Sequence, residues 1–101
     1  MDRRVELNNK LRVILGTDNV YFQPPSDIRL TYPCIVYNLD GASSDYANND
    51  NYQVKKYYQV TYMDRRPDSP VVDKLITFPY SSLSSTMRVD GLNQYVFRIY
   101  H

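Results

Sequence analysis

The clearest pattern of hydrophobic and polar positions lies in residues 53–63, where apolar and aromatic side chains recur at every second position. In an extended chain this spacing places Val54, Tyr58, Val60 and Tyr62 on one side. The other side carries Gln53, Lys55, Gln59 and Thr61. β-Branched and aromatic residues dominate the run, and neither Gly nor Pro interrupts it. The pattern predicts the longest strand of an antiparallel sheet with one exposed side.

Two other segments have helical spacing. Residues 2–16 begin with Asp2, which can cap a helix, and end at Gly16; the apolar stripe consists of Val5, Leu7, Leu11, Ile14 and Leu15. A second, short helix is predicted from Pro70, with Ser69 as its N-cap. Its apolar stripe consists of Val71, Val72, Leu75 and Ile76, and Phe78-Pro79 ends it.

The remaining apolar runs predict four further strands. Residues 19–23 precede a double proline, so that strand is brief or lies at an edge. Residues 32–39 carry apolar side chains on both faces, which indicates either a central position or an interface on the second face. Residues 83–89 lead through Asp90-Gly91, a strong hairpin turn, into a last strand that contains residues 95–100. The predicted fold is one α+β domain over 1–101, with two helices on a largely antiparallel sheet in the order α-β-β-β-α-β-β.

Residues 40–52 form the most polar segment, with three aspartates and no Lys or Arg. Read as a hairpin connection, the segment exceeds the usual two to five residues. We therefore expect a loop that becomes ordered only when the protein assembles with a partner. The residues assigned to this loop are Asp45, Tyr46, Asn48, Asn49 and Asp50.

Composition narrows the classes of partner. Twelve basic and eleven acidic residues give a net charge of +1, which supplies no general attraction for nucleic acid or an anionic membrane. The single cysteine, Cys34, excludes an internal disulfide and is expected to be a small buried hydrophobe. No apolar run reaches membrane-spanning length, so a soluble protein made in the cytoplasm is expected. Eleven tyrosines are more than a small core can satisfy, which indicates surfaces that meet other molecules.

The sequence offers little for catalysis. It contains one His, one Glu and one Cys, no Cys/His spacing typical of a metal site, and only isolated glycines. We therefore predict no enzyme, with no catalytic, metal-binding or cofactor-binding residue and no cofactor. One pattern of candidate binding residues remains. Basic and aromatic side chains are interleaved in Lys55-Lys56-Tyr57-Tyr58, and two further basic residues follow at Arg65-Arg66. Proteins that bind single-stranded nucleic acid combine basic and aromatic residues in this way. The competing interpretation is that these charges protect an exposed strand from unwanted pairing.

Several segments together resemble the tail-completion, or tail-terminator, proteins of long-tailed bacteriophages. They are residues 32–37 (Tyr-Pro-Cys-Ile-Val-Tyr), 46–49 (Tyr-Ala-Asn-Asn), 60–69 (Val-Thr-Tyr-Met-Asp-Arg-Arg-Pro-Asp-Ser), Lys74-Leu75 with 78–80 (Phe-Pro-Tyr), and 90–94 (Asp-Gly-Leu-Asn-Gln). The resemblance covers roughly residues 30–100. The chain differs from the family pattern at Arg66, Gly91 and Gln94, where an acidic residue, Asn and His are favoured.

The resemblance implies a structural virion protein of the head–tail junction. Such proteins form a hexameric ring on the head-proximal end of the tail tube, where the ring stops tube polymerisation and joins the head. The implied partners are other copies of the chain, the tail tube protein and a head-completion or connector protein, with DNA passing through the ring without sequence readout. A head-closure or adaptor protein and a single-stranded nucleic-acid-binding module stay as alternatives.

For the contacts of such a ring, the sequence suggests two groups of residues. One is the turn after the long strand, with Asp64, Arg65, Arg66 and Asp68. The other is the exposed side of the strand itself, with Lys55, Tyr57 and Gln59. A ring uses two different patches of each subunit, so two such groups fit this kind of assembly.

Overall fold

A computed structural model describes residues 3–46 and 52–101 of the chain. The elements follow the order α1 (Arg3–Leu15), β1 (Val20–Phe22), β2 (Cys34–Tyr46), β3 (Tyr52–Asp64), α2 (Pro70–Ile76), β4 (Ser81–Val89) and β5 (Leu92–Tyr100). The strands form one five-stranded sheet in the order β1-β2-β3-β5-β4. Only β1 and β2 are parallel, and the other neighbours are antiparallel. The predicted α+β class and element order are therefore confirmed.

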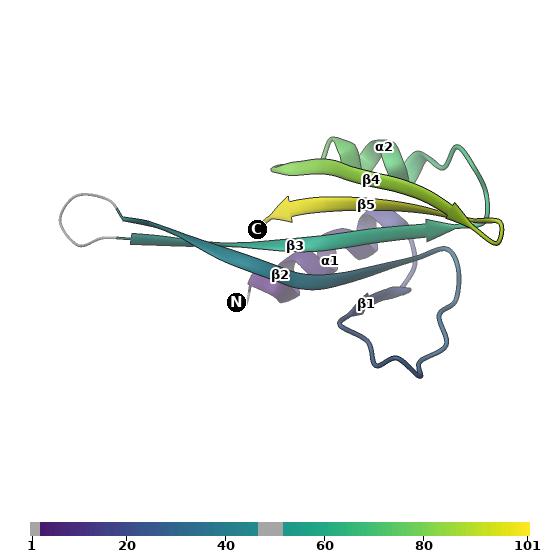
Figure 1. Ribbon diagram of the computed structural model, residues 1–101, viewed down its shortest axis with the longest axis horizontal. Helices are drawn as coiled ribbons and strands as arrows, with labels where there is room; N and C mark the ends of the chain where they lie inside the picture. Colours follow the sequence, from purple (N-terminus) through teal and green to yellow (C-terminus); the bar gives the residue numbers. More distant parts are fainter. Residues whose placement is uncertain (1–2, 47–51) are drawn as a thin grey trace.

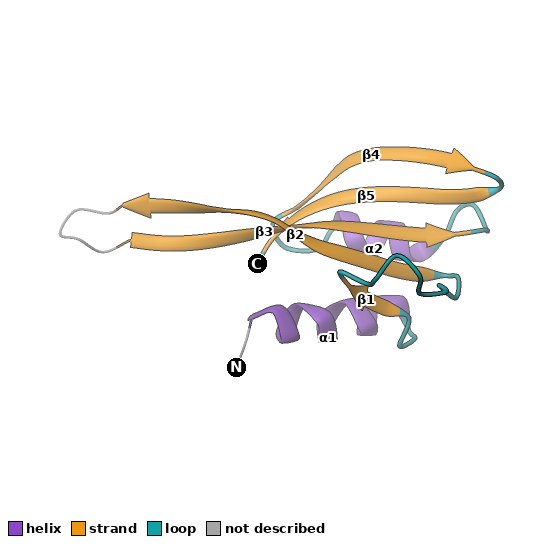
Figure 2. Ribbon diagram, turned by 60° about the horizontal axis from the view of Figure 1, so that its bottom comes forward, coloured by secondary structure: helices purple, strands orange, loops and turns teal. Residues whose placement is uncertain are grey.

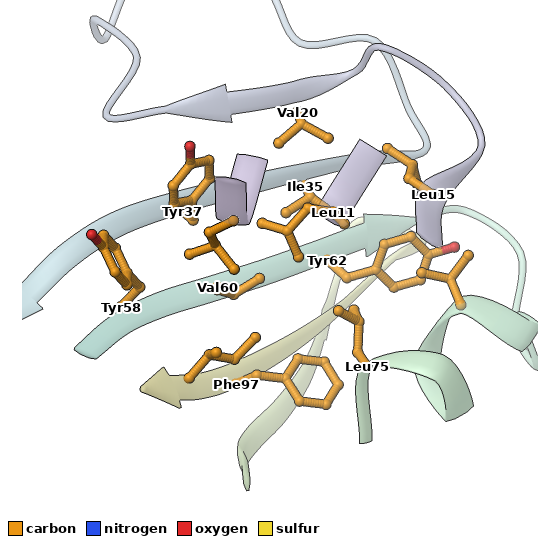
Figure 3. Close-up of a cluster of buried hydrophobic side chains, with 13 residues drawn as sticks. Leu11, Leu15, Val20, Ile35, Tyr37, Tyr58, Val60, Tyr62, Leu75 and Phe97 are labelled. Carbon is orange, nitrogen blue, oxygen red and sulfur yellow. The ribbon is translucent and has the colours of Figure 1, made fainter. Parts of the chain in front are cut away.

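Both helices pack on the same face of the sheet, and the hydrophobic core lies between them and the strands (Figures 1 and 2). The strands supply alternate residues to this face, since cross-strand partners share a side. Figure 3 shows how they meet the leucines of the helices. The core consists of Leu7, Leu11, Leu15, Val20, Ile35, Tyr37, Tyr58, Val60, Tyr62, Val71, Leu75, Phe97 and Ile99. The even-numbered side of β3 is buried as predicted at Tyr58, Val60 and Tyr62.

The ends of both helices follow the sequence signals. Gly16 has a φ of +82° and closes α1, with its N–H bonded to the carbonyl of Arg12 at 2.8 Å. Ser69 caps α2, because its Oγ accepts from the N–H of Val71 at 3.3 Å. The predicted apolar stripes are too wide, however. Val5 is 38% exposed and Ile76 is 46% exposed, so neither belongs to the buried side of its helix.

Tyr37 keeps a polar partner for its hydroxyl within the core. Tyr37 has no exposed surface, and its hydroxyl donates to Oδ1 of Asn8 on α1 at 2.7 Å. Its ring packs against Phe22, with 4.9 Å between the centroids, and edge-on to Tyr58 at 6.0 Å. Arg4 lies over Phe22, with Cζ 4.7 Å from the ring centroid. Aromatic rings thus form part of the core, and a helix cation packs on them.

The predicted central position of the strand in 32–39 is confirmed, and β5 also lies inside the sheet. β2 lies between β1 and β3, and β5 lies between β3 and β4. On β4 the sequence pattern misleads, because a bulge between Leu83 and Ser85 shifts the register. Leu83 pairs with Phe97 on the helix side, whereas Ser85 pairs with Val96 on the opposite side. The apparent alternation through Leu83, Ser85 and Met87 therefore does not describe one face.

The largest difference from the sequence prediction is the segment 40–52. β2 continues to Tyr46 and β3 begins at Tyr52, so most of the expected loop is a two-stranded ribbon. Asp45 and Tyr46 lie in this ribbon, while Asn48, Asn49 and Asp50 lie outside the described residues. The ribbon projects from the body of the domain (Figure 1). Residues 40–46 show no alternation of apolar side chains, so the sequence pattern did not reveal the β2 half of the ribbon, whereas the predicted strand 53–63 already covered most of the β3 half.

Candidate interaction surfaces

The ribbon begins where β1 and β5 end. β1 pairs with β2 only at residues 35–37, and β5 pairs with β3 only as far as the pair of Tyr57 with Tyr100. Residues 41–46 and 52–56 therefore form a ribbon of two strands, here called the arm. With the arm, the chain measures 52 × 25 × 22 Å along its principal axes. A protein of this length that is compact in all directions has a radius of gyration of about 13 Å, against 14.8 Å here.

The base of the arm is built around Tyr57, which lies on the face of the sheet that carries no helix. Its ring covers Gly41 on β2, where an added Cβ would overlap the Tyr57 hydroxyl. On its other side the ring packs against Tyr100, with 5.3 Å between centroids. Arg98 Cζ lies 5.0 Å from the Tyr57 ring centroid, and Arg98 Nη2 lies 3.5 Å from Asp40 Oδ2. Gly41 is required here because any side chain would displace the ring.

These contacts decide which predicted residues are available at the base of the arm. Gln59 is exposed and pairs with Asn38 and Arg98 in the sheet. Tyr57 is only half-exposed, since Tyr100 and Arg98 cover part of its ring. Lys55 pairs with Ser43 in the arm. At this end of β3, Gln59 is therefore accessible to a partner. Tyr57 is less accessible, because its ring already packs against other residues of the chain.

The turn after β3 holds a buried polar cluster. Asp64 is 2% exposed, and its Oδ2 lies 2.6 Å from the hydroxyl of Tyr62. The same hydroxyl lies 2.7 Å from Oγ of Ser69. Because a carboxylate only accepts, Tyr62 donates its single proton to Asp64 and accepts from Ser69. The cluster thereby joins the end of β3 to the first turn of α2.

The electrostatics of this cluster appear in Tyr62. Burial, reinforced by the hydrogen bond to the Asp64 carboxylate, raises the pKa of Tyr62 to about 12. Asp64 Oδ1 accepts from the backbone N–H of Arg66 at 3.0 Å. The Asp64 carbonyl accepts from Nδ2 of Asn93 at 3.2 Å. Asp64 therefore has an internal structural role, and its predicted contact with a neighbouring chain stays a prediction.

The other residues of the turn face outward. The Arg66 side chain is 78% exposed and lies 3.8 Å from Asp64 through Nε. Arg65 Cζ lies 5.3 Å from the ring centroid of Tyr32. Asp68 is exposed with a φ of +57°, a conformation that Asp and Asn tolerate in turns. Arg65, Arg66 and Asp68 are thus accessible in the chain by itself.

The two predicted groups of residues do not form one site. Tyr57 and Asp64 are seven positions apart on the same strand, which at the usual rise corresponds to about 23 Å. The arm and the turn lie at opposite ends of β3 (Figure 1). A partner that contacts both must therefore extend along the sheet, or two partners must bind separately.

Sequence reasoning missed a shallow groove of about 560 Å³ beside the C-terminal end of β5. It is lined by Glu6, Lys10, Phe78, Pro79, Tyr80, Tyr100 and His101. Tyr80 is 82% exposed with a φ of +60°. Glu6 Oε1 and Lys10 Nζ pair across one helical turn at 3.2 Å. The Phe-Pro-Tyr run at 78–80 was the only signal for it, and the helix side of the groove comes from the tertiary fold.

Reactive chemistry in the described residues is limited. Cys34 is buried, as predicted, and burial raises the pKa of its thiol to about 11. Among residues 3–46 and 52–101, no three His, Cys, Asp or Glu side chains gather as a metal site requires. No helix in that part of the chain is both long and apolar enough to cross a bilayer.

Comparison with known proteins leaves the family open. A scan against models of protein families returned no match, and a search of curated proteins also returned none.

Proposed function

We propose that this chain is a structural subunit of a bacteriophage tail that caps the head-proximal end of the tail tube as a ring. The ring, which we propose to be a hexamer, ends tube polymerisation and provides the surface that joins the head. Its partners are other copies of the chain, the tail tube protein and a head-completion or connector protein. DNA passes through the ring without sequence readout. The site of action is the head–tail junction of the virion, after synthesis in the host cytoplasm.

The observation that carries the proposal is the arm. An isolated two-stranded ribbon is marginally stable in water, so a chain that extends one beyond its core benefits from a partner that covers it. A ring subunit must offer two different surfaces to its two neighbours. The arm and the body of the domain are two such surfaces. The segments 32–37 and 60–69, which resemble tail-terminator proteins, contain the body parts of β2 and β3, and the segment 46–49 begins at the last described residue of β2 in the arm.

The chemistry of the side chains supports a structural rather than a catalytic role. The raised pKa of Cys34 keeps the thiol protonated at neutral pH, and the side chain has no exposed surface. Asp64, the most buried carboxylate named above, is engaged with Tyr62 and Arg66 in a turn. We therefore propose no reaction and no cofactor for this chain.

Single-stranded nucleic-acid binding is less well supported than the ring. Of the adjacent tyrosines in Lys55-Lys56-Tyr57-Tyr58, Tyr58 is 2% exposed and belongs to the core. Tyr57 is already packed against Tyr100 and Arg98. Base stacking needs an open aromatic face, so this segment is a poor platform.

The experiment is electron microscopy of tails assembled with and without the chain. Overlong tails in the absence of the chain support the proposed role as a tail terminator. Tails of normal length that fail to join heads identify the head-closure or adaptor alternative at the same junction instead. Tails of normal length that join heads overturn both.

A further inference from the structure

The outer edge of β4 is an unoccupied side of the sheet ladder. β4 is the last strand in the sheet order, and no described strand pairs with its outer edge. All its residues from Ser82 to Val89 are exposed. Asp90 and Gly91 both have positive φ, as in a type I′ turn, so the flanking Val89 and Leu92 form a hydrogen-bonded pair. Backbone groups alternate in direction along a strand, so Thr86 and Arg88 present N–H and C=O groups outward.

The β2 edge of the arm is a second unoccupied ladder. The last contact on this edge is made by Leu39, whose N–H donates to Oε1 of Gln23 at 3.1 Å. On the opposite strand, the Lys56 carbonyl accepts from the N–H of His101 at 3.0 Å, so Lys56 faces away from β2. Its β2 partner Ala42 must likewise face away from β3. Ala42 and, two positions on, Ser44 therefore direct their backbone groups to an edge that no described strand occupies.

These two edges belong to one chain and suit each other in charge and size. Residues 40–46 contain two aspartates and no basic residue, whereas β4 contains Arg88 and no acidic residue. Both strands are rich in small residues, which lets backbones approach closely. The other edge of the arm, which β3 forms, matches β4 less well, because Lys55 and Lys56 would repel Arg88.

We propose that β4 of one copy of this chain pairs with the β2 edge of the arm of a second copy. The two edges lie on opposite sides of the sheet order, β2 toward β1 and β4 at the far end. The contact is therefore heterologous: the copy that contributes β4 keeps its arm edge for a further neighbour, and the copy that contributes the arm keeps its β4 edge. Repetition of such a contact closes a ring when the rotation between copies permits it. The pairing explains the arm as a strand that completes the sheet of a neighbour.

The inference deepens the proposed function by naming the contact between subunits, and it rests on that proposal only for the closed ring. The test uses proline, which removes one backbone N–H, at an outward-facing position of each edge. The variants are Thr86→Pro on β4 and Ser44→Pro on the arm, and their controls are Thr86→Ala and Ser44→Ala, which keep the N–H. The absolute mass of the full chain is measured by light scattering up to its solubility limit.

We expect the wild-type chain and both alanine variants to form assemblies heavier than the 11.9 kDa chain. Each proline variant should reduce the assembled fraction at least tenfold while keeping the circular dichroism spectrum of the wild type. A wild-type chain that stays at the mass of one copy overturns the pairing. Folded proline variants that assemble like their alanine controls overturn it too, but leave a ring built on another contact intact.

Cross-linking provides a measurement that does not require a folded proline variant. Ser44→Cys and Thr86→Cys chains are prepared separately, mixed and treated with a short bis-maleimide, while buried Cys34 serves as an internal control in the wild type. The pairing requires the mixed product to exceed both self-linked products severalfold. Equal amounts of the three products, or none, overturn the pairing.

Discussion

Asp64 shows how a charged residue can serve the fold of this protein from within. Its carboxylate accepts from the hydroxyl of Tyr62 and from the N–H of Arg66, and it is 2% exposed. Polar residues in a turn are ordinarily exposed to solvent. From the sequence alone, Asp64 is therefore predicted to lie on a surface that contacts a partner. The tertiary fold brings Tyr62 and Ser69 next to Asp64, so the carboxylate stabilises the connection between β3 and α2.

Replacement of Asp64 by Ala should therefore destabilise the domain. Removing the carboxylate deprives the hydroxyl of Tyr62 and the N–H of Arg66 of their acceptor, and hydrogen bonds to a charged group contribute about 1.5 kcal/mol each at the lower end of their range. We expect the free energy of unfolding to fall by about 2–3 kcal/mol in urea denaturation. The matched control is Asp68→Asn, which preserves the turn conformation at an exposed site and should change stability by less than about 0.5 kcal/mol. Similar losses in both variants would contradict the internal role of Asp64.

The raised pKa of Tyr62 makes a second residue-scale prediction, on alkaline stability. In the unfolded chain the tyrosine releases its proton near pH 10, whereas the folded chain holds it to about pH 12. Between these values the folded state binds more protons, so stability is lost as pH rises. The excess stability of the wild type over Tyr62→Phe should be constant below pH 10 and shrink toward pH 12. Denaturation curves across that window measure it, and a constant difference would show that Tyr62 titrates alike in both states.

At the scale of elements, the junction of arm and body depends on one pair across β2 and β3. Gly41 follows a bulge after Leu39, and the ring of Tyr57 lies across it. Tyr57 then contacts Tyr100, the last residue of β5. The junction therefore links the arm to the strand where the five-stranded sheet ends. Bulges of this kind redirect a strand, and here the redirected strands leave the body.

Substitution Gly41→Ala should disturb this junction, because the new Cβ would overlap the tyrosine ring. Overpacking of this kind costs about 1–3 kcal/mol in the free energy of unfolding. The loss should be largely relieved when Tyr57 is truncated to Ala, which gives a favourable coupling energy in a double-mutant cycle. Gly41→Ala, Tyr57→Ala and the double variant are compared by urea denaturation. Additive losses would mean that the two residues do not touch.

A second element-scale prediction concerns the independence of the arm. Gly41, Ala42 and Lys56, the arm residues whose burial the structure describes, lie outside the core cluster. Joining Ser43 to Lys55 through Asn-Gly should therefore change the free energy of unfolding by less than about 1 kcal/mol, while lowering the radius of gyration in X-ray scattering toward about 13 Å. Under the proposed function, the shortened chain should fail to cap tails. A shortened chain that caps tails normally would remove the arm from the mechanism.

At the scale of the whole molecule, the fold separates surfaces along its long axis. The arm occupies one end of β3, and the turn with exposed Arg65 and Arg66 occupies the other (Figure 1). If the arm contacts a neighbouring copy, the turn is available for a different partner, such as the tail tube. The net charge of +1 gives neither end a strong general field.

The double variant Arg65→Ala/Arg66→Ala tests this division of surfaces. Arg65 loses its contact with Tyr32 and Arg66 loses a weak pairing with Asp64, so stability should fall by only about 0.5–1 kcal/mol. Under the proposed function, the variant should assemble with itself and bind tail tubes at least tenfold more weakly in co-sedimentation. The matched control is Lys74→Ala, an exposed cation on α2. Normal, correctly joined tails with the double variant would remove the turn from the contact surface.

The sequence alone determined the elements of the body, because each of them buries one side, is capped by a distinctive residue or adjoins a distinctive turn. Alternation in 53–63 identified β3, Ser69-Pro70 identified the start of α2, and Asp90-Gly91 identified the final hairpin. The local sequence is sufficient to predict such features, because periodic burial and turn geometry depend on residues that are close together in the sequence.

Only the tertiary structure determined the burial and pairing of residues whose neighbours come from distant parts of the chain. The β2 strand of the arm shows no apolar alternation in the sequence, and its ladder arises from the register between β2 and β3. Asp64 became internal because Tyr62 and Ser69 meet it, and Tyr57 became half-buried because Tyr100 and Arg98 come from β5. The strand of 53–63 was thus visible in the sequence. Its continuation into an arm at one end and a buried carboxylate at the other depended on contacts that no local pattern records.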